Sequence, residues 1–158
     1  MTKTSSWPDG GVQVTSAPAF PDAAAYASES ARHSALEVVD IRAGQAAVAG
    51  PYDNRVLFDV NDDCMRMAVF EGEYRWHCHP DSDELFLVVA GELRIDVAAG
   101  ATLTLREWQG TVVPAGTVHR TRAIGRTVNL TVERQGARTV FVDPPPAASP
   151  STGGREPV

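Results

Sequence analysis

The chain has 158 residues, 43% of them hydrophobic, and a net charge of −6. This length suits one domain with a sizeable core. The negative charge and the lack of a basic run argue against nucleic acid and anionic membranes as partners, because both attract clustered cations. Two cysteines outside any CxxC pattern suggest a reducing compartment, and no run approaches the ~20 apolar residues of a membrane-spanning helix. We therefore expect a cytoplasmic protein.

The chain is predicted to have three parts. Residues 1–35, rich in Ser, Ala and Pro, are expected to form a loose N-terminal arm with a helical turn near Asp22–Arg32. Residues 143–158 form a Pro/Ser/Gly tail that cannot bury enough surface to become ordered. Between them, residues 36–142 are expected to hold the folded domain.

This middle part is predicted to be all-β. Short runs rich in Val, Leu, Ile, Thr and aromatic residues are separated by Gly, Pro, Asp and Asn, a pattern typical of a sandwich or barrel. In one of them, Leu93, Ile95 and Val97 alternate with polar residues and so share a face. In chain order the expected strands are Leu36–Arg42, Arg55–Val60, Met65–Phe70, Tyr74–His79, Glu84–Ala90, Glu92–Ala98, Thr102–Arg106, Gly110–Val113, Val118–Arg122, Thr127–Glu133 and Arg138–Val142.

Three of the four histidines lie in strand-and-turn settings. Side chains two apart in a strand point the same way, so His77 and His79 should project together. The turn at Pro80–Asp83 can return Glu84 opposite this pair, and His119 follows a second turn about forty residues downstream. Neutral imidazoles with a carboxylate bind ions such as Zn, Fe, Mn, Ni or Co. The alternative is a set of hydrogen-bonded core histidines beside a solvated acidic turn.

Two motifs stand in these stretches, His77–x–His79–x4–Glu84–x6–Gly91 and Pro114–x–Gly116–x2–His119. Together they resemble the two motifs of the cupin superfamily, in particular of its small single-domain bacterial members. The resemblance covers about residues 65–133 and implies an antiparallel β jelly-roll barrel with ligands bound inside. It also implies that His77, His79, Glu84 and His119 bind one divalent metal ion (Fe, Zn, Mn or Ni).

The resemblance further suggests a homodimer. Tyr74 and Trp76 are candidate contacts, because their strand parity points away from the metal. By the same parity Arg75 should face inward with the histidines, where its guanidinium could clamp a substrate carboxylate or phosphate. An ion pair between Arg75 and Glu73 is the alternative.

Other side chains are candidates for the wall of a substrate pocket. Phe86 and Val88 share the face of Glu84 and should form an apolar wall, while Thr121 shares the face of His119 and offers a polar contact. Met67 could also line the pocket, although core packing is its alternative role.

The last core strand offers two faces. Either Asn129, Thr131 and Glu133 or the alternating apolar set Val128, Leu130 and Val132 faces inward. If the polar set does, Glu133 is the candidate catalytic residue, as a general acid or base. The alternative is a surface carboxylate at a strand end.

The function expected from these features is that of a metalloenzyme that acts on a small organic molecule bound next to the metal. Small cupins that resemble this chain include dioxygenases and cyclases of aromatic or polyketide intermediates, so an oxygenase, cyclase, isomerase or lyase is expected. A metal-dependent binding or sensing protein without turnover is the alternative. A storage-type cupin with a vestigial site is a third reading, which the intact ligand set disfavours.

Overall fold

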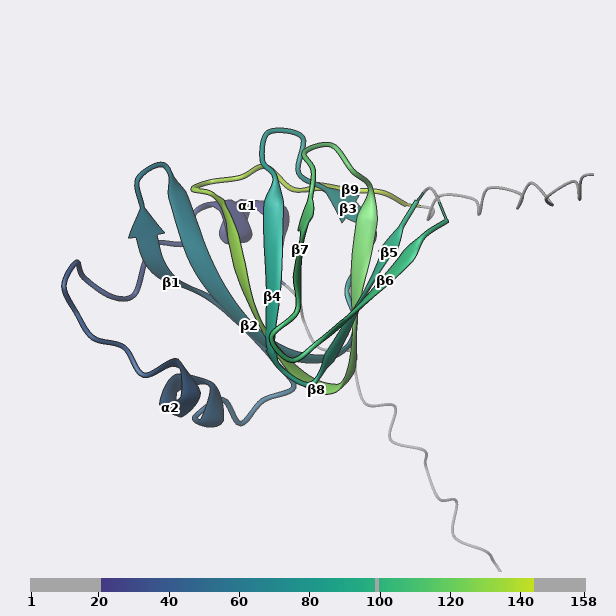
Figure 1. Ribbon diagram of the computed structural model, residues 1–158. Coiled ribbons are helices and arrows are strands. Elements are labelled where there is room, and N and C mark those ends of the chain that lie inside the picture. Colours follow the sequence, from purple (N-terminus) through teal and green to yellow (C-terminus); the bar gives the residue numbers. More distant parts are fainter. Residues whose placement is uncertain (1–20, 99, 144–158) are drawn as a thin grey trace, which may run out of the picture.

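Nine strands in residues 21–98 and 100–143, the part of the chain that the computed structural model describes, join into one antiparallel sheet that curls into a barrel (Figure 1). No helix in this part is long and apolar enough to cross a membrane. The expected tail after residue 143 and the first 20 residues of the expected arm lie outside the described residues. In chain order the elements are α1 (Ala23–Ala27), α2 (Ile41–Ala46), β1 (Tyr52–Val60), β2 (Asp63–Glu73), β3 (His77–Cys78), β4 (Glu84–Ala90), β5 (Glu92–Val97), β6 (Thr102–Arg106), β7 (Gly110–Val113), β8 (His119–Arg134) and β9 (Val140–Phe141).

The long strand β8 organises the sheet. Its second half pairs with β2 on one edge and β4 on the other, while its first half pairs with β5 and, at His119, with β3. The two strands expected over Val118–Arg122 and Thr127–Glu133 are therefore one strand, whose pairing with β2 is irregular at residues 124–126. Because β8 contacts both halves of the sheet, its side chains are buried along most of its length, apart from the exposed residues 124–126.

Three other expected strands differ from the structure. In place of the expected strand Leu36–Arg42, residues 36–40 form an exposed loop and Ile41 and Arg42 begin α2, while the expected strand Arg138–Val142 is reduced to Val140–Phe141. The Asp40 side chain accepts a hydrogen bond from Ala43 N, which caps this helix. In the expected strand Tyr74–His79 only His77 and Cys78 pair with neighbouring strands.

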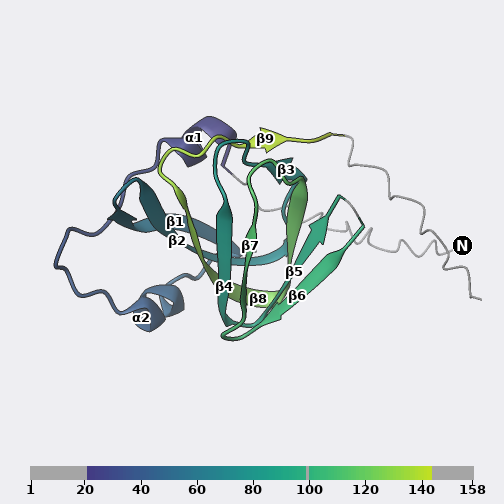
Figure 2. The ribbon, with the colours of Figure 1, turned by 45° about the horizontal axis from the view of Figure 1, so that its top comes forward.

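Residues 22–33 lie against the barrel, which corrects the expectation of a loose arm for this part. Asp22 caps α1 by accepting a hydrogen bond from Ala25 N at 2.8 Å. Further on, the backbone N–H groups of Arg32 and His33 donate to carbonyl oxygens of β1 at 3.1 and 3.2 Å. Figure 2 shows α1 at the same end of the barrel as β3 and β9.

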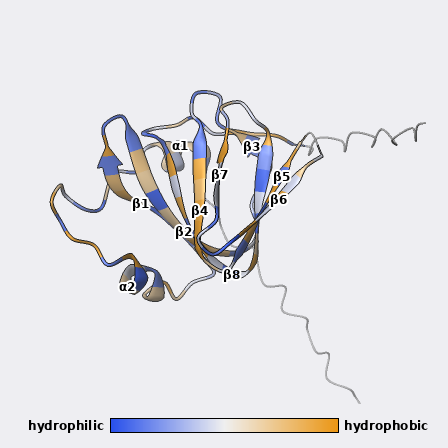
Figure 3. Ribbon diagram, viewed as in Figure 1, coloured by the Kyte–Doolittle hydropathy of each residue, from blue (hydrophilic) through white to orange (hydrophobic). Residues whose placement is uncertain are grey.

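The sheet carries an apolar cluster on each face. The inner cluster includes Phe86, Val88, Leu93 and Ile95, as strand alternation predicted for β4 and β5. Figure 3 shows β4 hydrophobic along most of its length. The outer cluster contains Met67 and is covered by apolar residues of the α2 segment. Met67 is therefore a core residue on the outer face of the sheet, and the prediction that it lines the pocket is wrong.

Candidate metal centre

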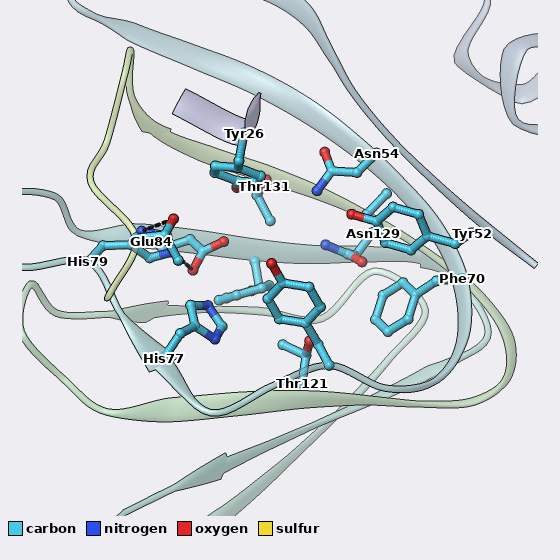
Figure 4. Close-up of a pocket in the computed structure, with 14 residues that line it drawn as sticks. Tyr26, Tyr52, Asn54, Phe70, His77, His79, Glu84, Thr121, Asn129 and Thr131 are labelled. Carbon is cyan, nitrogen blue, oxygen red and sulfur yellow. Dashed lines mark hydrogen bonds and ion pairs between the residues drawn. The ribbon is translucent and has the colours of Figure 1, made fainter. Parts of the chain in front are cut away.

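Three histidines and a glutamate gather at the end of the barrel near β3. His77 on β3 and His119 on β8 are directly paired residues of adjacent strands. Glu84 begins β4, and His79 follows β3 just before the turn. All four side chains are buried, with exposed fractions of 1–5%. Figure 4 shows His77, His79 and Glu84 turned toward one another.

Two hydrogen bonds hold the loop before His119 against the segment that carries His79 and Glu84. Gly116 N donates a hydrogen bond to His79 O at 2.9 Å, and Gly116 adopts a φ of 76°, which favours glycine. The Asp83 carboxylate accepts a hydrogen bond from Ala115 N at 2.8 Å, so it points away from the cluster. This turn therefore presents Glu84 to the histidines and uses Asp83 to hold the facing loop.

The hydrogen bonds of the three histidines define their tautomers. Each Nδ1 faces a backbone carbonyl oxygen, which can only accept, so each Nδ1 carries the proton. Each Nε2 then has a free lone pair, the arrangement found in metal-bound histidines. The accepting oxygens, at 2.8, 3.3 and 2.9 Å from His77, His79 and His119, belong to Arg75, Arg138 and Thr117.

The atoms at the centre of the cluster are close together without being hydrogen-bonded. Glu84 Oε2 lies 3.4 Å from His79 Nε2 and 3.3 Å from His119 Nε2. In the described structure neither Glu84 Oε2 nor His119 Nε2 has a hydrogen-bond partner, although both are buried. Buried acceptors that face one another are unfavourable unless a cation lies between them. These residues therefore fit a bound metal ion.

The potential ligand atoms form two overlapping groups, each within 4.8 Å. One group contains His77, Glu84 and His119, and the other contains His79, Glu84 and Glu133. All four expected ligands thus lie in one cluster, with Glu84 shared between the groups. Glu133, which was expected only as a candidate acid or base, lies beside them.

Burial and neighbouring groups shift the proton affinities in this cluster. Burial and the nearby His119 lower the pKa of His77 to about 4, which keeps its imidazole neutral. Burial acts to raise the pKa of Glu84, but interaction with His119 and His79 outweighs it and lowers the pKa to about 2, and Glu84 in turn raises the pKa of His79. A bound divalent ion would supply the positive charge beside the ionised Glu84 that a histidine proton otherwise supplies, and it would require each ligating imidazole to be neutral.

The register of β8 turns its polar face inward. Asn129 is paired with Ala68 of β2 and with Val88 of β4, and Glu133 is 2% exposed. The surface position that was the alternative for Glu133 is thereby excluded. Burial, followed by the charge of Glu84, raises the pKa of Glu133. The Glu133 carboxylate accepts a hydrogen bond from Arg66 Nε at 2.8 Å.

The structure separates the expected pocket residues. Phe86 and Thr121 line a pocket next to the cluster, and their role in binding stays a prediction. Val88 has the expected face but packs deeper, in the inner core, with no exposed surface. Arg75 is exposed, and its guanidinium lies 4.0 Å from the centroid of the Phe141 ring. The prediction that Arg75 faces inward is therefore wrong. The expected strand is interrupted before His77, so the alternation of side chains does not continue from His77 back to Arg75.

The same interruption of the strand explains why Tyr74, which was predicted to point away from the metal, lies in the pocket. Tyr74 lines the pocket, with its ring 5.1 Å from that of His77, because β2 ends at Glu73 and the chain turns before β3 begins. Tyr26 of α1 stacks on His79 at 6.2 Å, and no local sequence signal indicates this long-range contact. The lining residues that sequence reasoning missed are Tyr26, Tyr52, Asn54, Ala68, Phe70, Tyr74 and Thr139.

A jelly-roll barrel with a buried cluster of histidines and carboxylates at one end defines a class of small β-proteins that can bind ligands inside the barrel. A family model described as "Cupin domain" matches residues 65–132. The chain belongs to the cupin family.

Relatives extend this similarity. The chain is 53% identical over 93 residues to the "Uncharacterized protein YdbB" of Bacillus subtilis, which covers 59% of this chain and 82% of that protein. It is 39% identical over 77 residues to the "Polyketide synthase CurC" of Streptomyces cyaneus, 49% of this chain and 44% of that protein. The crystal structure of a cupin-2 domain containing protein from Shewanella frigidimarina superposes with a TM-score of 0.58 at 28% identity, over 61% of this chain and 94% of the other.

Proposed function

We propose that this protein is a metal-dependent cupin enzyme that transforms a small organic molecule inside the barrel. His77, His79, Glu84 and His119 would hold one divalent ion. The observation that carries the proposal is the convergence of buried histidine Nε2 atoms on Glu84 Oε2, an oxygen for which the described residues supply no hydrogen bond. When bound, such an ion would polarise a carbonyl group, acidify a bound water or, as iron, activate dioxygen.

Glu133 favours a reaction in which a proton is moved. Its carboxylate lies within 4.8 Å of potential ligand atoms of His79 and Glu84. Its raised pKa brings it closer to neutral pH, where a general acid or base is most effective. We therefore favour a cyclase or isomerase over an oxygenase. The similarity to a protein named as a polyketide synthase supports a polyketide-like substrate.

The metal site can be tested with two adjacent carboxylates as a matched pair. Glu84→Gln removes a proposed ligand, whereas Asp83→Asn changes the same group on a side chain that points out of the cluster. Protein purified without a histidine tag is incubated with iron, zinc, manganese or nickel, desalted and analysed by mass spectrometry. We expect about one ion per chain in the wild type and Asp83→Asn, and a loss of at least about tenfold in affinity for Glu84→Gln.

A wild-type protein that retains none of these metals would overturn the proposal. Metal loss in Asp83→Asn, with retention in Glu84→Gln, would show that the carboxylate ligand is wrongly assigned. Glu133→Gln separates an enzyme from a binding protein without turnover. If the protein is an enzyme, this variant should retain the metal and slow the reaction about 10²–10⁴-fold. If it is a binding protein, the wild type shows no turnover, so the variant changes no reaction rate.

A further inference from the structure

The pocket extends from the histidines to a second polar end. It has a cavity volume of about 50 Å³, enough for a few water molecules or one small ligand. Figure 4 shows Asn54, Asn129 and Tyr52 near one another, on the far side of the pocket from His79 and Glu84. A ligand that reached the metal would therefore also meet this second end.

Strand register places the two amides around a gap. Asn54 on β1 is paired with Ala68 on β2, and Ala68 is paired with Asn129 on β8. Residues paired in this way across adjacent strands project from the same face of the sheet. The methyl group of Ala68 leaves the space between the two amides open to the pocket, which all three residues line.

Both amides have an acceptor without a donor. Asn54 Oδ1 and Asn129 Oδ1 are buried and have no hydrogen-bond partner in the described structure. Asn129 is 2% exposed and projects from the middle of a strand paired on both edges, so it cannot turn to bulk water. A buried carbonyl oxygen in this position is stabilised when a ligand or a bound water donates to it.

The charges around the pocket disfavour an anionic ligand. No lysine or arginine is among the described residues that line it. Arg66, the one buried arginine or lysine among the described residues, is already paired with Glu133 and Glu29. Two carboxylates, Glu84 and Glu133, lie at the metal end. A carboxylate or phosphate at the amide end of the ligand would therefore find no cation to pair with, and at the metal end only the proposed ion would attract it.

We propose that Asn54 and Asn129 form an acceptor subsite that selects an uncharged, ring-sized ligand with a hydroxyl or N–H group at the end away from the metal. The aromatic walls, with Tyr26, Phe70 and Phe86 among them, suit a planar ring. This inference rests on the proposed function, because it concerns the same pocket. It names the class of substrate that the pocket accepts.

The test uses resorcinol and hydroquinone as probes, each compared with its monomethyl ether. Neither diol can chelate one ion through both oxygens, because its hydroxyl groups are not adjacent on the ring. Each ether keeps one hydroxyl group for the metal end and lacks the second O–H donor, which would bind the asparagines. Binding to the full chain is measured by calorimetry with and without zinc. For at least one diol we expect the wild type to prefer the diol over its ether by about tenfold.

Two variants remove the acceptors, and one serves as control. Asn129→Leu should reduce the diol-to-ether preference to about one while the affinity for the ether stays unchanged. Asn54→Leu, at a half-buried position, repeats the test if the first variant does not fold. Gln135→Leu makes a similar amide-to-leucine change on an exposed side chain outside the pocket, and it should keep the preference.

The outcomes distinguish this proposal from the proposed function. If zinc binds but the preference is absent, or persists in both asparagine variants, the subsite is overturned and the metal site stands. If benzoate or phenyl phosphate binds more tightly than the diols in an Asn129-dependent way, the substrate class is wrong. If zinc does not bind but the preference for a diol over its ether still depends on Asn129, the subsite stands and the metal-dependent function is overturned.

Discussion

Arg66 donates a hydrogen bond of 2.8 Å from Nε to Glu133 Oε1, and both residues are 2% exposed. The same guanidinium donates to Glu29 Oε2 at 3.0 Å and to Tyr26 O at 2.6 Å, and it lies 3.7 Å from the centroid of the Tyr26 ring. Arg66 thus joins the segment around α1 to the barrel. It also fixes Glu133 next to the candidate metal centre.

Replacing Arg66 by Met should strongly destabilise the fold, because Glu133 would be left as a buried charge without its partner. We expect a loss of about 3–5 kcal/mol in the free energy of unfolding, measured by urea denaturation at pH 7. Arg94→Met breaks an ion pair with Glu92 in which the arginine side chain is 40% exposed. That control should lose about 1 kcal/mol or less. Equal losses in the two variants would contradict the role assigned to Arg66.

Metal binding should raise the melting temperature. At a metal concentration 100 times Kd, binding to the folded state alone adds about 2.7 kcal/mol, which corresponds to roughly 5–10 °C for a chain of this size. Differential scanning fluorimetry with zinc, before and after EDTA, measures the shift. Glu84→Gln should show a much smaller shift than Asp83→Asn. A shift that Glu84→Gln retains in full would mean that the stabilising ion binds elsewhere.

Stability should depend on pH through Asp96. Arg122, together with Thr102 and Arg120, lowers the pKa of this carboxyl well below its usual range. Because the folded-state pKa is depressed, the stabilisation is fully present above the unfolded pKa of about 3.9 and is lost as the pH falls below it. Asp96→Asn should therefore cost about 1–3 kcal/mol between pH 5 and 8, and less at pH 3.

Urea denaturation of the wild type and Asp96→Asn across this range gives the difference. A difference that is constant down to pH 3 would show that the ionised carboxylate is not what stabilises the fold. Glu71→Gln, at an exposed position of β2, controls for the general effect of removing a carboxylate.

Two glycines with the same backbone conformation should respond differently to alanine. Gly91 and Gly72 have φ values of 85° and 84°, so each substitution carries a similar backbone strain of about 1–2 kcal/mol. A Cβ at Gly91 would lie 2.8 Å from Arg126 O, whereas one at Gly72 would meet no atom of the described residues within 4 Å. Gly91→Ala should therefore cost at least about 2 kcal/mol more than Gly72→Ala, measured by thermal or urea unfolding. Equal costs would contradict the close approach of β8 at Gly91.

The homodimer implied by the family resemblance remains a prediction. The outer faces of β4 and β7 carry Leu85 and Val112, which are paired across the strands and are 38% and 51% exposed. Light scattering on the wild type should give twice the mass of one chain. Val112→Glu should shift the equilibrium toward monomer by about tenfold or more, if this apolar face is the contact. A monomer mass at all concentrations would end the dimer prediction.

Motif spacing and strand alternation determined much of this protein. His77 and His79 share a direction because they are two residues apart, and the short turn before β4 allows Glu84 to return beside them. The inward placement of Phe86, Leu93 and Ile95 follows from the same period of two. These features depend on residues that are near neighbours in the chain, so the local sequence pattern is enough to predict them.

Only the tertiary structure decided the rest. The inward face of β8, with Asn129 and Glu133, depends on its register with β2 and β4, and either face was compatible with the local pattern. Tyr74 lines the pocket and Arg75 is exposed, the reverse of the prediction, because the alternation of side chains does not continue across a break between strands. Tyr26 reaches the pocket through contacts with Arg66 and His79, which lie 40 or more residues away along the chain. Such long-range pairings arise when the whole sheet closes, and no short stretch of sequence specifies them.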